Sequence, residues 1–334
     1  MKGKLSKCLL AGIMLASVGN YANVSHVTAE TQTEPVGTTV VAPAETDVKV
    51  HFINLNDLPE RTIGSADCIL IEDNGVVTLV DTGNPIDFSI QRMTDYIDGL
   101  GITRIDNLFA THPHNDHTGG MVAVLEKYDV GTIYVKASDW KTLYQHEITK
   151  DGPRSQFDET YLAAKRKLNS DGTTVQIVEP NQEGMKITVN ANSYFEIFNC
   201  TYAWENHHYN PEFNDFSMVI KYTHKDVAAL LMSDINKYYE NAVLGKVGEC
   251  EIFKVAHHGT MNSRSSDELF AEINAQVGII TGIRANFVDR WGIGDLEADD
   301  LLESKGITCK ITQDGDVVVW TDGTDGHVTQ DLKE

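Results

Sequence analysis

Apolar and polar residues alternate in short segments from residue 48 to the end of the chain. Alternation with period two, or a short β-branched run, predicts a strand, and apolar residues three or four apart predict an amphipathic helix. The apolar runs 68–72 and 76–81 are joined by "DNG", a strong signal for a tight hairpin turn. The pattern of the first half predicts strands at 48–55, 68–72, 76–81, 107–111 and 132–136, and helices at 88–100 and 119–128.

The second half repeats this style after a polar stretch, 137–170, which we expect to form helices over one face. The pattern predicts strands at 174–178, 194–198, 217–222, 227–234, 251–256, 277–281, 308–312 and 316–322, and helices at 236–247, 266–275 and 297–306. Two β-rich halves, each with helices following strands, indicate the α/β class. We expect an αββα sandwich of two face-to-face mixed β-sheets with helices on the outer faces, in one domain spanning 48–334.

The N-terminus has the pattern of an export signal. Three lysines within the first seven residues precede the apolar run 8–18, which is too short to span a bilayer. Small residues near Ala29 suit cleavage, so we expect residues 1–29 to be a signal peptide and 30–47, rich in Thr, Pro and Glu, to be a linker. The alternative is a buried N-terminal helix, but the charge pattern favours a secreted or cell-surface protein with no membrane span after cleavage.

The formal net charge is −22, and loss of the three N-terminal lysines makes the mature chain still more negative. A polyanion is repelled by such a chain, so we expect a small-molecule or cell-envelope substrate and not nucleic acid. Cys68, Cys200, Cys250 and Cys309 show no C-x-x-C spacing, which excludes zinc-ribbon and redox motifs. Export permits disulfides between these cysteines. Cys68 and Cys200 lie in predicted apolar strands, and the alternative that they are buried core thiols is favoured.

The segment "THPHNDHTGG" holds His112, His114, Asp116 and His117 directly after a predicted strand. Zinc binds imidazole nitrogens and carboxylate oxygens at about 2.0–2.2 Å. In an extended segment residues i and i+2 point the same way, so His112 and His114 can bind one ion. As the chain turns into the next helix, Asp116 and His117 can face a second ion. The alternative, a chance cluster in a solvated loop, is disfavoured by this density of ligand-type residues.

Three further predicted strands end in ligand-type residues. Asp81 ends the strand 76–81 in "VDTG", and Asp234 ends the strand that contains "ALLMSD". His257 and His258 directly follow "FKVA". Asp81 can orient ligand imidazoles, or it can cap the turn before Gly83. Adjacent residues at a strand end are expected to point to opposite sides, so one metal should take only one of the two histidines.

Together these motifs resemble the metallo-β-lactamase superfamily over nearly all of residues 48–323. More narrowly, "NDFSMVIKY", "LLMSD" and "FKVAHHGT" resemble the branch that holds the hydrolase domain of DNA-uptake competence proteins and the secreted teichoic-acid phosphorylcholine esterase. The resemblance implies a metal-dependent hydrolase domain over 48–334 with two Zn²⁺ ions, or Mn²⁺ in their place.

The resemblance also implies a role for each residue. His112 and His114 would bind the first metal, Asp116 and His117 the second, and Asp234 would bridge the two ions. Matching "H-G-T" makes His258 the last ligand of the second metal. The implied catalytic residues, which orient the nucleophile or face the substrate, are Asp116, Asp234 and His257.

The chain departs from the family pattern at several positions. Many members have a histidine about 20 residues before the bridging aspartate, where this chain has Asn214 and Ser217. The first metal then has fewer ligands and is open to substrate, unless another group such as the histidine pair at 207–208 replaces the missing one. Ser233 stands where the family usually has glycine. The region 286–295 lacks the "GHP"-like element of the competence proteins, so the resemblance fixes no substrate.

A di-zinc hydrolase is the function that these residues favour, because two ions lower the pKa of a bridging water and polarise the substrate. We expect a secreted phosphodiesterase that uses a metal-bridging hydroxide on a small or cell-surface phosphodiester, similar to the phosphorylcholine esterase. Trp140, Trp204, Tyr209 and Trp291 either line a box for a choline-like cation or belong to the core. The alternatives are a lactone or ester hydrolase of the same fold and a non-catalytic ligand-binding member; a true β-lactamase is disfavoured by the missing histidine.

Overall fold

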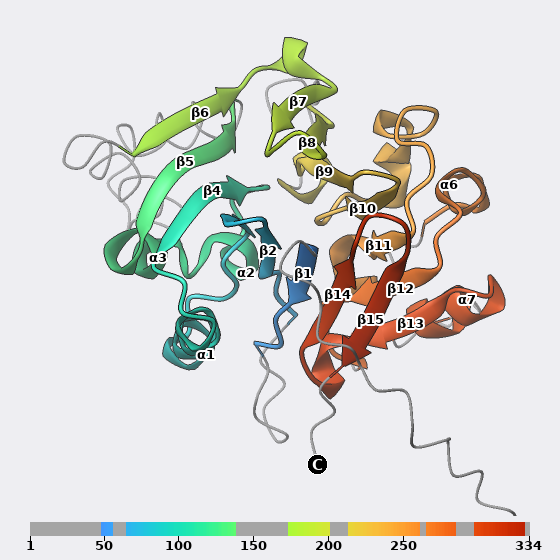
Figure 1. The fold of residues 1–334 in the computed structure, drawn as a ribbon. Coiled ribbons are helices and arrows are strands. Elements are labelled where there is room, and N and C mark those ends of the chain that lie inside the picture. The colour runs from blue at the N-terminus through green and yellow to red at the C-terminus, as the bar shows by residue number, and fades with distance from the viewer. Residues whose placement is uncertain are drawn as a thin grey trace, which may run out of the picture. The chain divides into compact units, whose positions relative to one another are not determined.

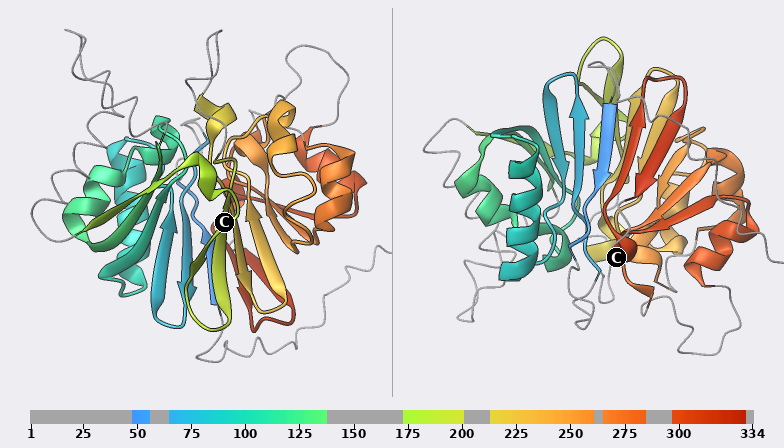
Figure 2. Two further views of the ribbon diagram at one scale, coloured as in Figure 1. Left: turned by 90° about the horizontal axis from the view of Figure 1, so that it is seen from above. Right: turned by 60° about the horizontal axis from the view of Figure 1, so that its bottom comes forward.

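The computed structural model describes residues 48–55, 65–137, 173–200, 213–260, 265–284 and 297–330. All of them belong to one compact unit, Pro43–Glu334. Within this unit two mixed β-sheets pack face to face and helices cover their outer faces, as Figures 1 and 2 show. The αββα sandwich expected from the sequence is thus confirmed.

The first sheet has eight strands in the order β15-β14-β1-β2-β3-β4-β5-β6. Their bounds are β1 Val48–Phe52, β2 Ile69–Asp73, β3 Val76–Val80, β4 Arg104–Ala110, β5 Asp129–Lys136, β6 Thr174–Val178, β14 Val317–Thr321 and β15 Gly326–Gln330. From β3 to β6 the strands are parallel, and the others are antiparallel. In the β2–β3 hairpin, Asn74 (φ 51°) and Gly75 (φ 86°) adopt the left-handed conformation that the "DNG" signal predicts.

The second sheet has seven strands in the order β13-β12-β11-β10-β9-β8-β7. Their bounds are β7 Met185–Thr188, β8 Ser193–Phe198, β9 Val219–His224, β10 Val227–Leu231, β11 Ile252–Lys254, β12 Val277–Ile280 and β13 Thr308–Ile311. Strands β10 to β13 are parallel, so their carboxyl ends lie along one edge. Loops at this edge are therefore placed to carry a functional site.

Helices α1 (Asp87–Gly99), α2 (Asn115–Thr118) and α3 (Met121–Lys127) lie on the first sheet, and α6 (Asp267–Ile273) and α7 (Ala298–Ser304) lie on the second (Figure 2). Short 3₁₀ helices connect other elements: η1 Pro180–Gln182, η3 Phe213–Phe216, η4 Lys237–Ala242, η5 Ala256–Gly259 and η8 Thr312–Asp314. The core between the sheets includes Phe109, Phe195 and Tyr222, and separate apolar clusters lie under the helices of each outer layer. Burial of these clusters against both faces of each sheet is the main stabilisation of the four layers.

Three details differ from the sequence-based expectation. Segment 236–247 contains the 3₁₀ helix η4 where an α-helix was expected, because its backbone bonds run from Tyr239 to Asn236 and from Val243 to Glu240, three residues apart. The helix expected at 119–128 is α3, and the helical turn α2 directly before it was not expected. Strands β7 and β15 were not anticipated. The helices expected within 137–170 lie outside the described residues, apart from Ala137.

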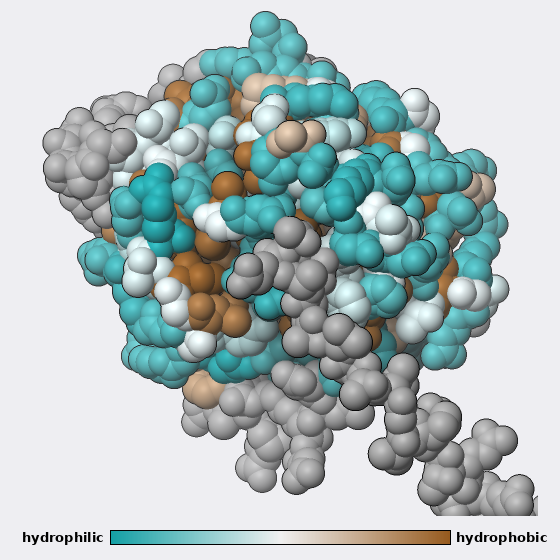
Figure 3. Space-filling model, viewed as in Figure 1, coloured by the Kyte–Doolittle hydropathy of each residue, from teal (hydrophilic) through white to brown (hydrophobic). Residues whose placement is uncertain are grey.

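The described surface is mostly polar, as expected for a chain in which 23% of the residues are charged. Hydrophilic residues cover most of the face in Figure 3, and hydrophobic residues gather mainly left of centre, in the region of β4, α2 and α3. Among the described helices, none combines the length and the apolar character that a membrane crossing requires. The four cysteines form no disulfide with one another, and burial raises the pKa of the Cys200 and Cys250 thiols to about 12. Cys68, Cys200 and Cys250 are buried core thiols, and Cys309 is partly buried.

Candidate metal centre

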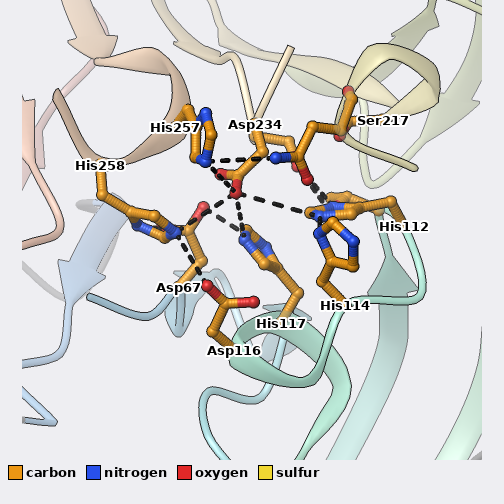
Figure 4. A network of polar contacts seen from close by, with 12 residues as sticks. Asp67, His112, His114, Asp116, His117, Ser217, Asp234, His257 and His258 are labelled. Atoms are coloured by element: carbon orange, nitrogen blue, oxygen red, sulfur yellow. Dashed lines mark hydrogen bonds and ion pairs between the residues drawn. The ribbon is translucent and has the colours of Figure 1, made fainter. Parts of the chain in front are cut away.

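The candidate site lies where strands of both sheets end. The histidine motif connects β4 to α2, Asp81 follows β3, Asp234 follows β10, and His257 with His258 follows β11. Figure 4 shows the imidazoles of His112, His117, His257 and His258 around the carboxylate of Asp234. The fold therefore brings together residues that are up to 177 positions apart in the chain.

The local conformation of the motif is the one that its spacing predicts. His112 follows the end of β4, and His114 is extended (φ −73°, ψ 149°) at the start of α2. His112 Nε2 lies 3.2 Å from His114 Nδ1. Two nitrogen ligands of one tetrahedral ion, each at about 2.0–2.1 Å from it, are themselves about 3.3 Å apart. The pair therefore fits one metal ion.

A second group of possible ligand atoms gathers on the other side of Asp234. Its Oδ2 lies 3.1 Å from His117 Nε2 and 3.4 Å from His258 Nε2, and His258 Nε2 lies 3.5 Å from Asp116 Oδ2. Ligands at about 2.0–2.2 Å from one ion are about 2.8–3.6 Å apart. Asp116, His117, Asp234 and His258 each offer one ligand atom, and all four atoms lie within 4.8 Å of one another.

The imidazole nitrogens of this group are prepared for a metal. The Nδ1 of His117 donates to Asp81 Oδ2 at 2.7 Å, and the Nδ1 of His258 donates to the Thr281 carbonyl at 3.0 Å. The Nε2 atoms of both rings are buried, and neither has a hydrogen-bond partner of good geometry among the described residues. An acceptor on Nδ1 fixes the tautomer whose Nε2 lone pair is free, which is how metal-binding histidines are usually supported. Buried polar atoms without a partner are costly, so these fit a bound cation.

Asp234 occupies the position expected of a bridging carboxylate. Besides the contacts with the second group, its Oδ2 lies 4.0 Å from His112 Nε2 and 3.8 Å from His257 Nε2. Its side chain is only 1% exposed. The carboxylate thus lies between the His112–His114 pair and the second group.

Charges around Asp234 favour a cation. Burial lowers the pKa of His117, but the carboxylates of Asp234, Asp81 and Asp67 outweigh burial and hold this pKa well above its usual value. Burial would raise the pKa of Asp234, but His117 and His258 hold it well below its ordinary range. Burial together with the neighbouring His117 lowers the pKa of His112 well below its usual value. The carboxylate side therefore stabilises positive charge, and the His112 side presents a neutral ligand.

Two buried residues of the site were missed in the sequence. Asp67, in the loop before β2, lies 2.5 Å from Lys254 Nζ and 3.3 Å from His258 Nδ1. Lys254, in β11, is fully buried and lies 3.8 Å from Asp234 Oδ1. Charged residues are almost never fully buried unless paired, so a lysine within the apolar run "EIFKVA" was a usable signal.

The two adjacent histidines do not point to opposite sides, so the strand-end argument is wrong. Strand β11 ends at Lys254, and η5 places both His257 (φ 47°) and His258 (φ 57°) in the left-handed region. Both rings face Asp234 (Figure 4). They differ in exposure, because the side chain of His257 is 23% exposed and that of His258 is 3% exposed. His258 is the one that lies with Asp116, His117 and Asp234, and His257 lies nearer to solvent.

Asn214 is one of the two residues that the sequence comparison set against the histidine of many family members. It belongs to η3 and is 6% exposed; its amide nitrogen donates to His257 Nε2 at 3.1 Å, and its side chain also bonds His114. The hydroxyl of Ser217 donates to the Asn214 carbonyl at 2.8 Å. Asn214 therefore connects His257 to the His112–His114 pair. The histidines at 207–208, the region 286–295 and the four aromatic residues considered for a cation box lie outside the described residues.

Comparisons agree with this geometry. The family model of the metallo-β-lactamase superfamily matches residues 61–171, which include the whole histidine motif. No curated protein matches the sequence. Similar solved structures include the metallo-β-lactamase fold protein YhfI from Bacillus subtilis, with 11% identity, coverage of 85% of this chain and 100% of that chain, and a TM-score of 0.47.

A second is a diphosphatase of the PhnP family, with 13% identity, coverage of 86% of this chain and 100% of that chain, and a TM-score of 0.42. A third is the Rm3 metallo-β-lactamase, with 16% identity, coverage of 58% of this chain and 72% of that chain, and a TM-score of 0.37. With TM-scores below 0.5, these likenesses carry no argument about substrate. The family model matches part of the chain, and together with the histidine motif and the αββα sandwich it identifies a metallo-β-lactamase fold and a metal-dependent hydrolase.

Proposed function

We propose that the protein is an exported phosphodiesterase that uses two divalent cations, zinc or alternatively manganese, to cleave a small or cell-surface phosphodiester. The observation that carries this proposal is the position of Asp234, whose Oδ2 lies 3.1 Å from His117 Nε2 on one side and 4.0 Å from His112 Nε2 on the other. A carboxylate placed in this way suits two ions that act on one phosphate.

The side chains divide between two cation positions. His112 and His114 would hold the first ion, and Asp116, His117 and His258 the second, with Asp234 shared between them. When bound, such a pair supplies Lewis acidity and a nucleophilic hydroxide at neutral pH.

The buried charges support two ions rather than one. Asp67, Asp81, Asp116 and Asp234 lie in or beside the centre, and the only ammonium in contact with them among the described residues is that of Lys254. With neutral histidines, this set has an excess of three negative charges. One divalent ion leaves the centre negative, whereas two make it positive before the hydroxide forms and neutral afterwards. Only with two ions does the centre not repel a phosphodiester anion.

The remaining groups act on the nucleophile and the substrate. The carboxylates of Asp116 and Asp234 accept hydrogen bonds from the attacking water and orient it. His257 is the more exposed histidine, and the Asn214 amide orients its ring through Nε2. In the proposed role, Nε2 exchanges this hydrogen bond for one with the substrate, and it can protonate the leaving oxygen only after taking up a proton itself.

A lactone or ester hydrolase is the second candidate, since the same centre can polarise a carbonyl. A phosphodiester is favoured because its two non-bridging oxygens can each meet one cation. A long nucleic acid is disfavoured by the net charge of −22. The resemblance of "FKVAHHGT" to the phosphorylcholine-esterase branch supports a cell-envelope substrate.

The first prediction concerns the reaction itself. The purified mature chain should hydrolyse bis-p-nitrophenyl phosphate and p-nitrophenylphosphorylcholine faster than a lactone or a cephalosporin. Chelation should abolish the activity, and zinc or manganese should restore it. Replacing Asp234 by asparagine should remove activity, whereas Asp314→Asn, at a carboxylate on the surface, should not. Rapid lactone hydrolysis without phosphodiester cleavage would select the second candidate, and ligand binding without any turnover would indicate a non-catalytic member.

The second prediction concerns export. Material secreted from a native host should begin close to residue 30, because the basic and apolar pattern of residues 1–18 directs export and cleavage. N-terminal sequencing measures this directly. A secreted chain that begins at Met1 would refute the signal peptide.

A further inference from the structure

Ser233 has an unusual conformation for a residue with a side chain. It lies between β10 and Asp234, is 2% exposed, and has φ 49°. Its carbonyl accepts the His257 amide at 2.8 Å and the Lys254 ammonium at 2.9 Å, which holds this conformation in place. The left-handed region favours glycine. A serine kept there at a cost in strain points to a use for its hydroxyl.

The hydroxyl of Ser233 belongs to a chain of hydrogen bonds that ends at Asp81. Ser233 Oγ donates to Thr111 Oγ1 at 2.7 Å, and Thr111 Oγ1 donates to Asp81 Oδ2 at 2.7 Å. Asp81 also accepts the Thr111 amide at 2.9 Å and His117 Nδ1 at 2.7 Å. The carboxylate only accepts, so the direction of every hydrogen bond in the chain is fixed.

This direction determines the state of His112. Its Nδ1 lies 3.3 Å from Ser233 Oγ and 3.2 Å from Thr111 Oγ1. Each hydroxyl has a single proton, and both protons are already donated toward Asp81. The two oxygens can therefore only accept from His112, so Nδ1 carries the ring proton. The lone pair is then on Nε2, which faces His114 and Asp234.

We propose that Ser233 is a positioning residue that, with Thr111, fixes the tautomer and ring orientation of His112, so that Nε2 is presented to the first metal. This inference rests on the proposed two-ion function. The first site needs such support because Asn214 stands in place of one histidine ligand, so each remaining ligand must be well oriented. Through Thr111, Asp81 then sets the tautomer of His112 as well as that of His117.

The test uses Ser233→Gly and Ser233→Ala in the full mature chain. Glycine removes the hydroxyl but suits φ 49°, whereas alanine removes the hydroxyl and keeps the strain. Ser193→Ala is the matched control. Ser193 is also a buried serine whose hydroxyl lies 2.7 Å from a histidine nitrogen, but it pairs with His224 at the opposite end of β8 and β9 from Asp234.

Long-range ¹H–¹⁵N spectra of the histidines in the metal-free protein report the tautomers directly. In the wild type and in Ser193→Ala, His112 should be protonated at Nδ1. In both Ser233 variants the share of the Nδ1-protonated tautomer should fall, because His112 Nδ1 loses one of its two acceptors and keeps only Thr111 Oγ1 at 3.2 Å. Zinc titration against a chromophoric chelator should then show about 10- to 100-fold weaker binding at one site and unchanged binding at the other. Ser233→Gly should be at least as stable as the wild type, which separates loss of the hydroxyl from loss of folding.

A tautomer ratio of His112 unchanged from the wild type, together with two native zinc affinities, in Ser233→Gly would overturn the proposal. The same spectra decide the question if the wild type binds metal but cleaves no phosphodiester, because that result would overturn the proposed function alone. If Ser233→Ala does not fold, the glycine variant still gives both measurements.

Discussion

Replacing His258 by alanine should remove one metal ion from the protein and most of its hydrolytic activity, whereas replacing His257 should leave both ions in place. His258 is 3% exposed, its Nδ1 is bonded to the Thr281 carbonyl, and its Nε2 lies 3.4 Å from Asp234 and 3.5 Å from Asp116. His257 is 23% exposed and already accepts Asn214 at Nε2. Loss of His257 should lower kcat by about 10²–10⁴-fold, the usual effect of a general acid or base. Loss of His258 should lower kcat by a larger factor than loss of His257.

Zinc per chain in the two variants decides the assignment. His327→Ala serves as the control, because this histidine is exposed and stacks on Trp320 in the β14–β15 hairpin. The control should keep both the metal content and the activity of the wild type. A His257→Ala protein that loses zinc, together with a His258→Ala protein that keeps it, would reverse the two roles.

The part of the centre within the histidine motif was predictable because it is local. His112, His114 and His117 come from a strand end, an extended residue and one helical turn, and each of these follows from six consecutive positions. Asp81 and Asp234 were predictable as acidic residues that end apolar strands. Their meeting at one edge follows once the αββα arrangement is assumed.

The buried ion pair could not be predicted because it depends on packing between distant segments. Asp67 and Lys254 are 187 positions apart, and each looks like an isolated polar residue beside an apolar run. Only the packing of β11 against the loop before β2 brings them to 2.5 Å. The left-handed turn at His257 and His258 is a tertiary effect too, because φ above zero is uncommon for any residue other than glycine and the Ser233 carbonyl holds the turn.

The two strands that were not anticipated are both at sheet edges. β7 and β15 end the second and the first sheet, and their residues alternate between partly buried and exposed positions. An edge strand is covered on fewer sides than a central strand, so it needs fewer apolar residues and gives a weaker pattern. The central strand β10, which is wholly buried, and the buried carboxyl-terminal part of β4, Leu108–Ala110, were recognised from their apolar runs.

Replacing Lys254 by methionine should destabilise the metal-free protein by about 3–5 kcal/mol, the cost of leaving one partner of a buried ion pair alone. The side chains of Lys254 and Asp67 are 0% and 2% exposed. Burial alone would raise the pKa of Asp67, but Lys254, His258 and His117 hold it well below its usual range. Methionine conserves the volume of lysine but leaves the carboxylate without its ammonium, so the loss is electrostatic and is not caused by a cavity.

Urea unfolding of the chelator-treated protein measures this loss, and two further variants identify its cause. Arg284→Met removes an exposed bidentate pair with Asp314, whose side chains are 49% and 35% exposed, and should change the free energy of unfolding by less than about 1 kcal/mol. The double variant Lys254→Met with Asp67→Asn should lose less than the sum of its single variants, because the second change removes the unpaired charge that the first creates. Additive losses, or a Lys254→Met loss no larger than that of Arg284→Met, would show that the ammonium does not compensate Asp67.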